Sequence, residues 1–112
     1  MVRGALLLVV SLVSLAAQTA SITGTVRDPQ LRPIPDVSVT LTRVDMGVVV
    51  RANTDVEGNY EFGLVRPGNY IIKIKHSGFR AIQQGPIKLD LDQRARINVV
   101  LELGEATSAV IV

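Results

Sequence analysis

The segment from Thr54 to Ile74 constrains the fold more than any other part of this sequence, because its turn signals separate segments of alternating polarity. Asp55 to Gly58 predicts a tight turn, since an Asp side chain can bond the backbone two residues on and Gly accepts a positive φ. Apolar residues then recur at every second position, as in a half-buried strand. They are Tyr60, Phe62 and Leu64 before a turn at Pro67-Gly68, and Tyr70, Ile72 and Ile74 after it. The segment is therefore expected to form a β-meander.

The rest of the chain repeats this pattern of short alternating segments and turns. Further strands are expected over residues 21–27, 37–44, 48–53, 79–84, 87–91 and 96–103, the last with Ile97, Val99, Leu101 and Leu103 on one face. Residues 28–36 hold three of the five prolines and predict a rigid surface loop, because proline cannot donate to a sheet. Gly85-Pro86 is expected to interrupt the chain between two strands. Beyond residue 17 no window has helical periodicity, so an all-β sandwich is predicted.

The first 17 residues have the pattern of a secretory signal peptide. Arg3 precedes an apolar run over residues 5–17, and small side chains follow it. Cleavage is expected after Ala17, with Ala16 the next choice, and a retained membrane anchor is the alternative. A lipoprotein-type anchor is excluded because the chain has no cysteine to acylate. Residues 18–104 are then the folded domain, and residues 105–112 are a β-prone tail or a truncated junction.

Charge and cysteine content exclude several classes of function. The chain has 12 Lys and Arg against 10 Asp and Glu, and removal of Arg3 leaves 11 against 10, a net charge of +1. Nucleic-acid binding is not expected, because it needs clustered cations and here they are dispersed along the strands. Without cysteine an exported chain has no disulfide framework, so its stability must come from an apolar core.

Short motifs between residues 21 and 103 resemble the carboxypeptidase regulatory-like domain family. The motif residues are Gly24, Asp28, Thr54, Asp55, Gly58, Tyr60, Phe62, Pro67, Gly68, Tyr70, Gly78 and Phe79. The resemblance implies a prealbumin-like, seven-strand antiparallel Greek-key sandwich, grouped with carbohydrate-binding-like folds. Family members usually have Gly where Leu31 stands and a small residue near Asp36, so the first loop is expected to differ in shape.

Each motif residue also has a plain structural explanation. Gly58 and Gly68 suit turns, and the four aromatic residues, Tyr60, Phe62, Tyr70 and Phe79, are expected in the core. The alternative for the aromatic residues is a platform for sugar stacking, which needs exposed rings, and the chain has no Trp. Asp28, Asp55 and Glu57 lack the spacing of a calcium loop, so they are expected to cap turns. Neither a metal nor a cofactor is predicted.

The sequence offers few candidate catalytic residues. His76 is the only histidine, so zinc ligands cannot be assembled, and the adjacent Ser77 cannot fold back onto it as a nucleophile. The transthyretin-like purine-pathway hydrolases depend on several histidines. His76 is expected at the surface. An isopeptide bond between Lys73 or Lys75 and Asn98, with Glu61 nearby, is conceivable but no spacing favours it. The chain is predicted not to be an enzyme.

The uncharged end of the sequence, ATSAVIV, predicts either pairing with a sheet edge or a natural chain that continues. Outer-membrane proteins that resemble TonB-dependent receptors carry a signal peptide and one such domain ahead of a plug and barrel. The resemblance therefore implies a non-catalytic binding or interaction module, accessory to such a protein or a stand-alone relative of one. A carbohydrate-binding module and a structural spacer are the alternatives.

The surfaces expected to bind are the loop at residues 28–36 and an edge strand at residues 79–89. The partner is expected to be a protein or a glycan, not nucleic acid, with membrane association only through the signal peptide or a downstream barrel. An exported location is expected, which could be periplasmic, associated with the outer membrane or secreted.

Overall fold

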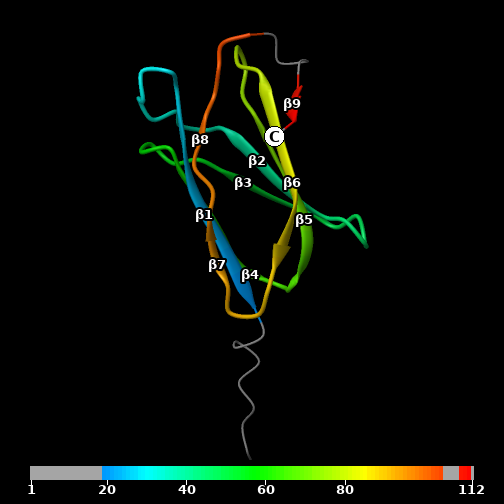
Figure 1. The fold of residues 1–112 in the computed structure, drawn as a ribbon. Helices are drawn as coiled ribbons and strands as arrows, with labels where there is room; N and C mark the ends of the chain where they lie inside the picture. Colours follow the sequence, from blue (N-terminus) through cyan, green and yellow to red (C-terminus); the bar gives the residue numbers. More distant parts are fainter. Residues whose placement is uncertain (1–18, 105–108, 112) are drawn as a thin grey trace, which may run out of the picture.

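The computed structural model describes residues 19–104 and 109–111, and within them the chain forms an all-β sandwich of two sheets (Figure 1). The strands are β1 (Ala20–Arg27), β2 (Ser38–Arg43), β3 (Val49–Asn53), β4 (Asn59–Val65), β5 (Gly68–Lys75), β6 (Ala81–Leu89), β7 (Arg94–Arg96), β8 (Val99–Val100) and β9 (Ala109–Ile111). The predicted signal peptide and its cleavage site at Ala17 lie outside the described residues. In the described part of the chain, no helix is long and apolar enough to cross a membrane.

The sandwich is confirmed, but strand number and direction differ from the seven antiparallel strands expected. One sheet has the order β4-β1-β7, with β8 also pairing with β1, and the other has the order β3-β2-β5-β6-β9. β7 and β8 run parallel to β1, and β9 runs parallel to β6. The chain passes from one sheet to the other after β1, β3, β4, β6 and β8, so each sheet collects strands that are distant in sequence.

The core lies between the two sheets and uses the alternating residues that the sequence predicts. The fully buried side chains are Ile22, Val26, Val37, Val39, Leu41, Ile72, Ile74, Leu89 and Leu101. Tyr60, Phe62 and Tyr70 are buried as well, and Phe79 is partly buried against the same cluster. Because strand side chains alternate between faces, this single set of residues fills the space between the sheets.

The prediction that Leu64 shares the core face of its strand is wrong. Ala20 of β1 pairs with Val65 and Ile22 pairs with Phe62, so β4 contains one residue more than β1 over this interval. The extra residue is a bulge, in which Leu64 has a φ of 55° and is 78% exposed. The bulge moves Val65 into the core position instead. A left-handed conformation costs a leucine roughly 1–2 kcal/mol.

The expected interruption at Gly85-Pro86 is also wrong, because β6 continues through it. The peptide bond between these residues is cis, and the pairing of β6 with β5 shifts register between Tyr70 and Ile72. A Cβ atom on Gly85 would lie 2.6 Å from the carbonyl oxygen of Tyr70, so only Gly fits this close approach. The two segments predicted over residues 79–84 and 87–91 are therefore one irregular strand.

The late strand predicted over residues 96–103 is broken. Between β7 and β8 the side chain of Asn98 accepts a hydrogen bond from the Thr25 amide, at 3.0 Å. After Leu101, which is fully buried, the chain leaves β1 and pairs with the segment around Phe79, so Leu103 is 70% exposed. The prediction that Leu103 faces the core is wrong for this reason.

Candidate interaction surface

The motif residues at the end of β1 and the start of β4 hold the loops together. The buried Thr54 hydroxyl accepts a hydrogen bond from the Val37 amide at 2.8 Å and donates one to the Ile34 carbonyl at 2.7 Å. Gly58 has a φ of 75°, and a Cβ atom there would lie 2.6 Å from the Val26 carbonyl oxygen. Thr54 and Gly58 therefore fix the loop at residues 28–36 against the turn that precedes β4.

Two of the three acidic residues weighed as calcium ligands, Asp28 and Asp55, cap turns, whereas Glu57 takes part only through its backbone amide, which donates to Asp55. The Asp28 carboxylate accepts from the amides of Gln30 and Arg32, and the Asp55 carboxylate accepts from those of Glu57 and Asn59. The bond from the Arg32 amide, helped by the Arg32 guanidinium, lowers the pKa of Asp28 below its ordinary value. Among the described residues, no group of three or more His, Cys, Asp or Glu side chains could hold a metal ion.

Tyr60 and Gly24 form one unit across the four-stranded sheet. The Tyr60 hydroxyl donates a 2.6 Å hydrogen bond to the Ile97 carbonyl, and a Cβ atom on Gly24 would lie 1.8 Å from that same oxygen. Burial raises the pKa of Tyr60 above its ordinary value, because the phenolate would lose its hydration. Tyr70 likewise bonds inward, to the Arg66 carbonyl at 2.6 Å. With both rings buried, neither tyrosine offers a face for sugar stacking.

The remaining candidate residues have structural positions. His76 is partly exposed and stacks on Phe79 with ring centroids 5.8 Å apart. Gly78 adopts a φ of 85° in the turn between these residues and β6. Lys73 and Lys75 alternate with buried isoleucines, so they face outward from the five-stranded sheet. Asn98 bonds in the other sheet, so the structure does not bring it together with the lysines.

The β9 strand covers part of the edge that the sequence analysis proposed for binding. β9 pairs with Ala81–Gln83 of β6, as the first of the two alternatives for the C-terminal tail expected. Of the proposed edge at residues 79–89, this leaves only the stretch after Gln83 without a neighbouring strand in the described chain. The candidate edge is therefore partly covered, and on the other side of the sandwich the outer edges of β3 and β4 have no neighbouring strand in the described chain.

The open side of the sandwich lies between the edge strands β3 and β4 (Figure 1). In the described chain β3 pairs only with β2, and β4 pairs only with β1. Val48 and Val50 lie opposite Arg43 and Leu41, on the face that points toward the core, yet they are 54% and 48% exposed. The β4 residues around the bulge lie across a cavity from these two valines instead of packing on them.

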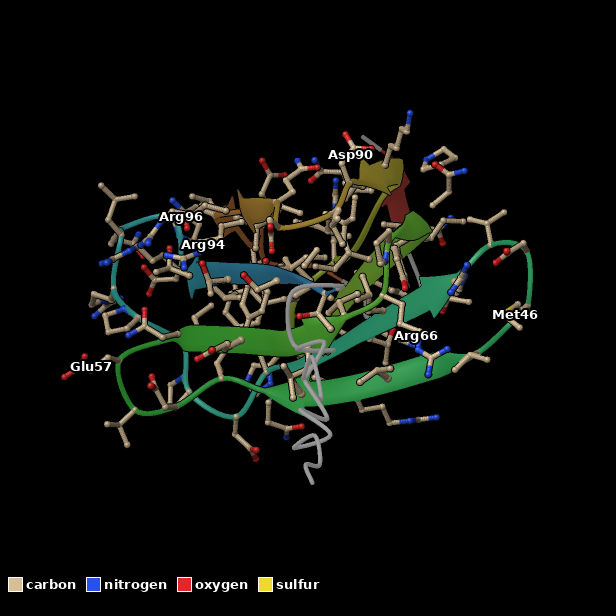
Figure 2. The ribbon with its side chains drawn as sticks, turned by 90° about the horizontal axis from the view of Figure 1, so that it is seen from below. Met46, Glu57, Arg66, Asp90, Arg94 and Arg96 are labelled. Carbon is tan, nitrogen blue, oxygen red and sulfur yellow. The ribbon has the colours of Figure 1, made fainter. Side chains whose placement is uncertain are left out.

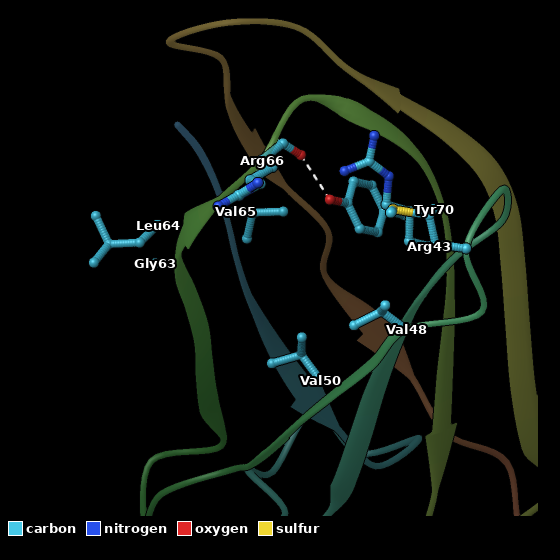
Figure 3. A pocket seen from close by; sticks show the side chains of 9 residues that line it. Arg43, Val48, Val50, Gly63, Leu64, Val65, Arg66 and Tyr70 are labelled. Atoms are coloured by element: carbon cyan, nitrogen blue, oxygen red, sulfur yellow. Dashed lines mark hydrogen bonds between the residues drawn. The ribbon is translucent and has the colours of Figure 1, made fainter. Parts of the chain in front are cut away.

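An apolar cavity of about 360 Å³ occupies this open side (Figure 3). It is lined by Arg43, Met46, Val48, Val50, Gly63, Leu64, Val65, Arg66 and Tyr70. Figure 3 shows Val48 and Val50 on one wall and Val65 of β4 on the other, while the side chain of Leu64 at the bulge points away from the cavity. Sequence reasoning missed this site because it assigned Leu64 to the core and treated residues 48–53 as an ordinary paired strand. The run of three valines at residues 48–50 was the available signal.

Two arginines at the cavity differ in their partners. Arg43 bonds Asp45 at 2.8 Å, and its guanidinium lies against Gly68. Arg66 is exposed and forms no ion pair with any described residue, and the same holds for Arg51 on β3. In the view of Figure 2 Arg66 and Met46 lie on the same side of the molecule. The open side is therefore apolar in the cavity and positively charged around it.

Two sheets packed face to face over a common apolar core define a β-sandwich module. The sequence of residues 21–102 matches the carboxypeptidase regulatory-like domain family. The chain belongs to this family, as its short motifs predicted.

Individual proteins that are similar to this chain in sequence or in fold agree with the family assignment. Over 96 residues the chain is 36% identical to the TonB-dependent transporter Oar of Myxococcus xanthus, a match that covers 85% of the chain and 9% of the transporter. Two solved structures share the fold. The TIE protein of Bacillus anthracis superposes with a TM-score of 0.62 at 13% identity, covering 77% of this chain and 17% of that one. A candidate carbohydrate-binding protein of Bacteroides uniformis gives 0.55 at 13% identity, with 74% and 41% coverage.

Proposed function

We propose that this chain is an exported interaction module, accessory to a protein that resembles a TonB-dependent transporter, and that it binds a protein partner through the open side between β3 and β4. The observation that carries the proposal is the pair of core-facing valines, Val48 and Val50, left half-exposed at the wall of an apolar cavity. Burying such a surface in water is favourable, so an exposed apolar wall of this kind marks a place where another molecule packs.

The relationship to the Myxococcus xanthus transporter supports the accessory role and an envelope location. The chain spans only 9% of that protein, so we expect the transport activity itself to reside outside the matched region. A sugar-binding role has less support, because the buried tyrosines are engaged in hydrogen bonds to backbone carbonyls.

Site-specific photo-crosslinking in cells tests the proposed surface. A photoreactive phenylalanine analogue replaces Val48 or Val50 in the native full-length protein, with Val56 and Leu91 as control positions, since both are exposed and neither lines the cavity. Adducts are expected at the first two positions. The absence of adducts there, or equal adducts at all four, would contradict the proposal.

Cell fractionation tests the accessory role separately. Antiserum against residues 21–103 should detect a band in the outer membrane that is far larger than a domain of this size. A small soluble band in the periplasm or the medium would instead mean that the module acts alone.

A further inference from the structure

The edge strand β3 has backbone groups that point away from its neighbour. The Arg43 amide donates to the Val48 carbonyl at 2.9 Å, and the Thr54 amide donates to the Val37 carbonyl at 3.1 Å. Bonded pairs in an antiparallel ladder alternate, so Val50 and Ala52 also bond to β2. The amide and carbonyl groups of Val49, Arg51 and Asn53 therefore point outward, and no described residue pairs with them.

β3 is also the least protected edge of the described sandwich. β4 carries a bulge at Leu64 and β7 is only three residues long with two arginines, features that block edge-to-edge pairing. β6 is covered in part by β9. β3 has neither proline nor bulge, and Arg51 is its only charged residue. A strand can therefore add to β3 with less obstruction than to any other edge.

The two faces of β3 specify what such a strand would carry. Side chains directly opposite in a sheet point to the same face. A residue opposite Val48 or Val50 would thus enter the apolar cavity, and a residue opposite Arg51 would lie on the outer face beside its unpaired guanidinium. Lys73 lies on that outer face too, because Thr40 pairs with both Arg51 and Lys73. The complement is apolar toward the cavity and, on the outer face that Val49 shares with Arg51, acidic opposite Arg51.

We propose that β3 binds an extended protein segment of alternating apolar and acidic residues, which adds to the five-stranded sheet as an antiparallel strand. The inference rests on the proposed function, since it names the partner of the same open side. The backbone groups of the bound segment form hydrogen bonds with those of Val49, Arg51 and Asn53. Its apolar side chains cover Val48 and Val50, and its carboxylates pair with Arg51. A second copy of this chain is a poorer partner, because pairing centred on Arg51 would oppose two arginines.

A synthetic peptide tests the register directly. The probe is acetyl-Val-Glu-Val-Glu-Val-Glu-Val-amide, added to the ¹⁵N-labelled chain and followed by amide chemical shifts. In the proposed register the Glu amides face β3 and the Val amides face solvent. Methylation of the Glu nitrogens should weaken binding at least about tenfold, since each removes a bond to β3, whereas methylation of the Val nitrogens should change it little.

Variants of the protein give matched controls. Val49→Pro removes an outward amide that β2 does not use and should weaken binding, while Val49→Thr keeps that amide and should not. Arg51→Glu should make the protein prefer a peptide of the same length in which Lys replaces each Glu. If Val49→Pro fails to fold, the methylated peptides and the Arg51→Glu variant still test whether the peptide pairs with β3.

Three results would overturn the inference. The first is a set of amide chemical-shift changes centred on Arg94 and Arg96, which would place the peptide on β7. The second is an affinity that methylation of the Glu nitrogens leaves unchanged. The third is dimerisation of the chain through β3 in place of peptide binding. Crosslinks at Val50 in cells together with failure of the peptide would reject this inference alone. Peptide binding without crosslinks in cells would reject the proposed function and leave the edge chemistry standing.

Discussion

The hydroxyl of Tyr60 on β4 donates a hydrogen bond to the carbonyl of Ile97, just beyond β7, across the central strand β1 (2.6 Å). The bond passes over Gly24, where a side chain would occupy its path. One polar contact thus connects the two outer strands of a sheet whose middle strand must carry a glycine.

Tyr60→Phe should destabilise the domain by about 1 kcal/mol, because it keeps the ring in the core and removes only the hydrogen bond. Urea unfolding followed by circular dichroism measures the change. An unchanged midpoint would mean that water or another group satisfies the Ile97 carbonyl equally well.

The free energy of unfolding should fall in alkaline solution, because the buried Tyr60 hydroxyl resists ionisation in the folded state. Burial raises its pKa in the folded state, so its contribution is complete below the ordinary tyrosine value, near pH 10, and is lost as pH rises toward the folded-state pKa. Urea midpoints measured from about pH 8 to pH 11 should decline less steeply for Tyr60→Phe than for the wild type. Parallel curves for the two proteins would contradict this assignment.

Gly24→Ala should destabilise the domain by about 3 kcal/mol or more, because the added methyl group collides with backbone rather than with a movable side chain. Gly63→Ala is the matched control on a neighbouring strand, where the nearest atom would lie 3.8 Å away. Thermal unfolding of the two variants gives the comparison, and equal losses would show that the clash at Gly24 relaxes.

Thr54→Val should cost about 2 kcal/mol, since it leaves the buried Val37 amide and Ile34 carbonyl without a partner. Thr54→Ser keeps the hydroxyl and should recover most of that loss. Chemical denaturation distinguishes them. If Ser were as damaging as Val, the methyl group rather than the hydroxyl would be the important part of Thr54.

Leu31→Gly should stabilise the domain by up to about 1 kcal/mol, because Leu31 adopts a φ of 65° that leucine disfavours and glycine accepts. Val56→Gly serves as the control, since Val56 is equally a solvent-exposed loop residue but has no positive φ. It should lower stability slightly. A loss for Leu31→Gly would mean that the flexibility of the unfolded chain outweighs the relief of strain.

The same backbone explains how this chain departs from its family. Leu31 and Asp36 stand where relatives are expected to have Gly or a small residue, and both adopt positive φ, 65° and 59°. The loop at residues 28–36 therefore has a glycine-type conformation at both positions. Asp tolerates it more easily than Leu, since its short polar side chain can bond locally.

Local patterns sufficed for the strands and turns whose determinants are close in sequence. Alternation predicted the buried faces of β1, β2 and β5, and the Asp-Gly turn before β4 was recognisable from residue chemistry alone. The capping roles of Asp28 and Asp55 also follow from their positions, because a capping bond spans only a few residues.

Features that depend on contacts between distant strands could not be predicted. The bulge that exposes Leu64 exists because β1 pairs with β4 in a particular register, and a shift of one residue reverses the face of every later side chain. The break between β7 and β8 depends on Asn98 reaching Thr25, which is 73 residues away.

The sequence by itself determined an all-β chain, most of its core residues and its family. Only the tertiary structure decided which edge strands remain open and that Val48, Val50 and Val65 line one cavity. Periodicity records whether a side chain is apolar, whereas exposure depends on which strand of the opposite sheet lies above it. That information resides in the pairing of strands and not in any single segment.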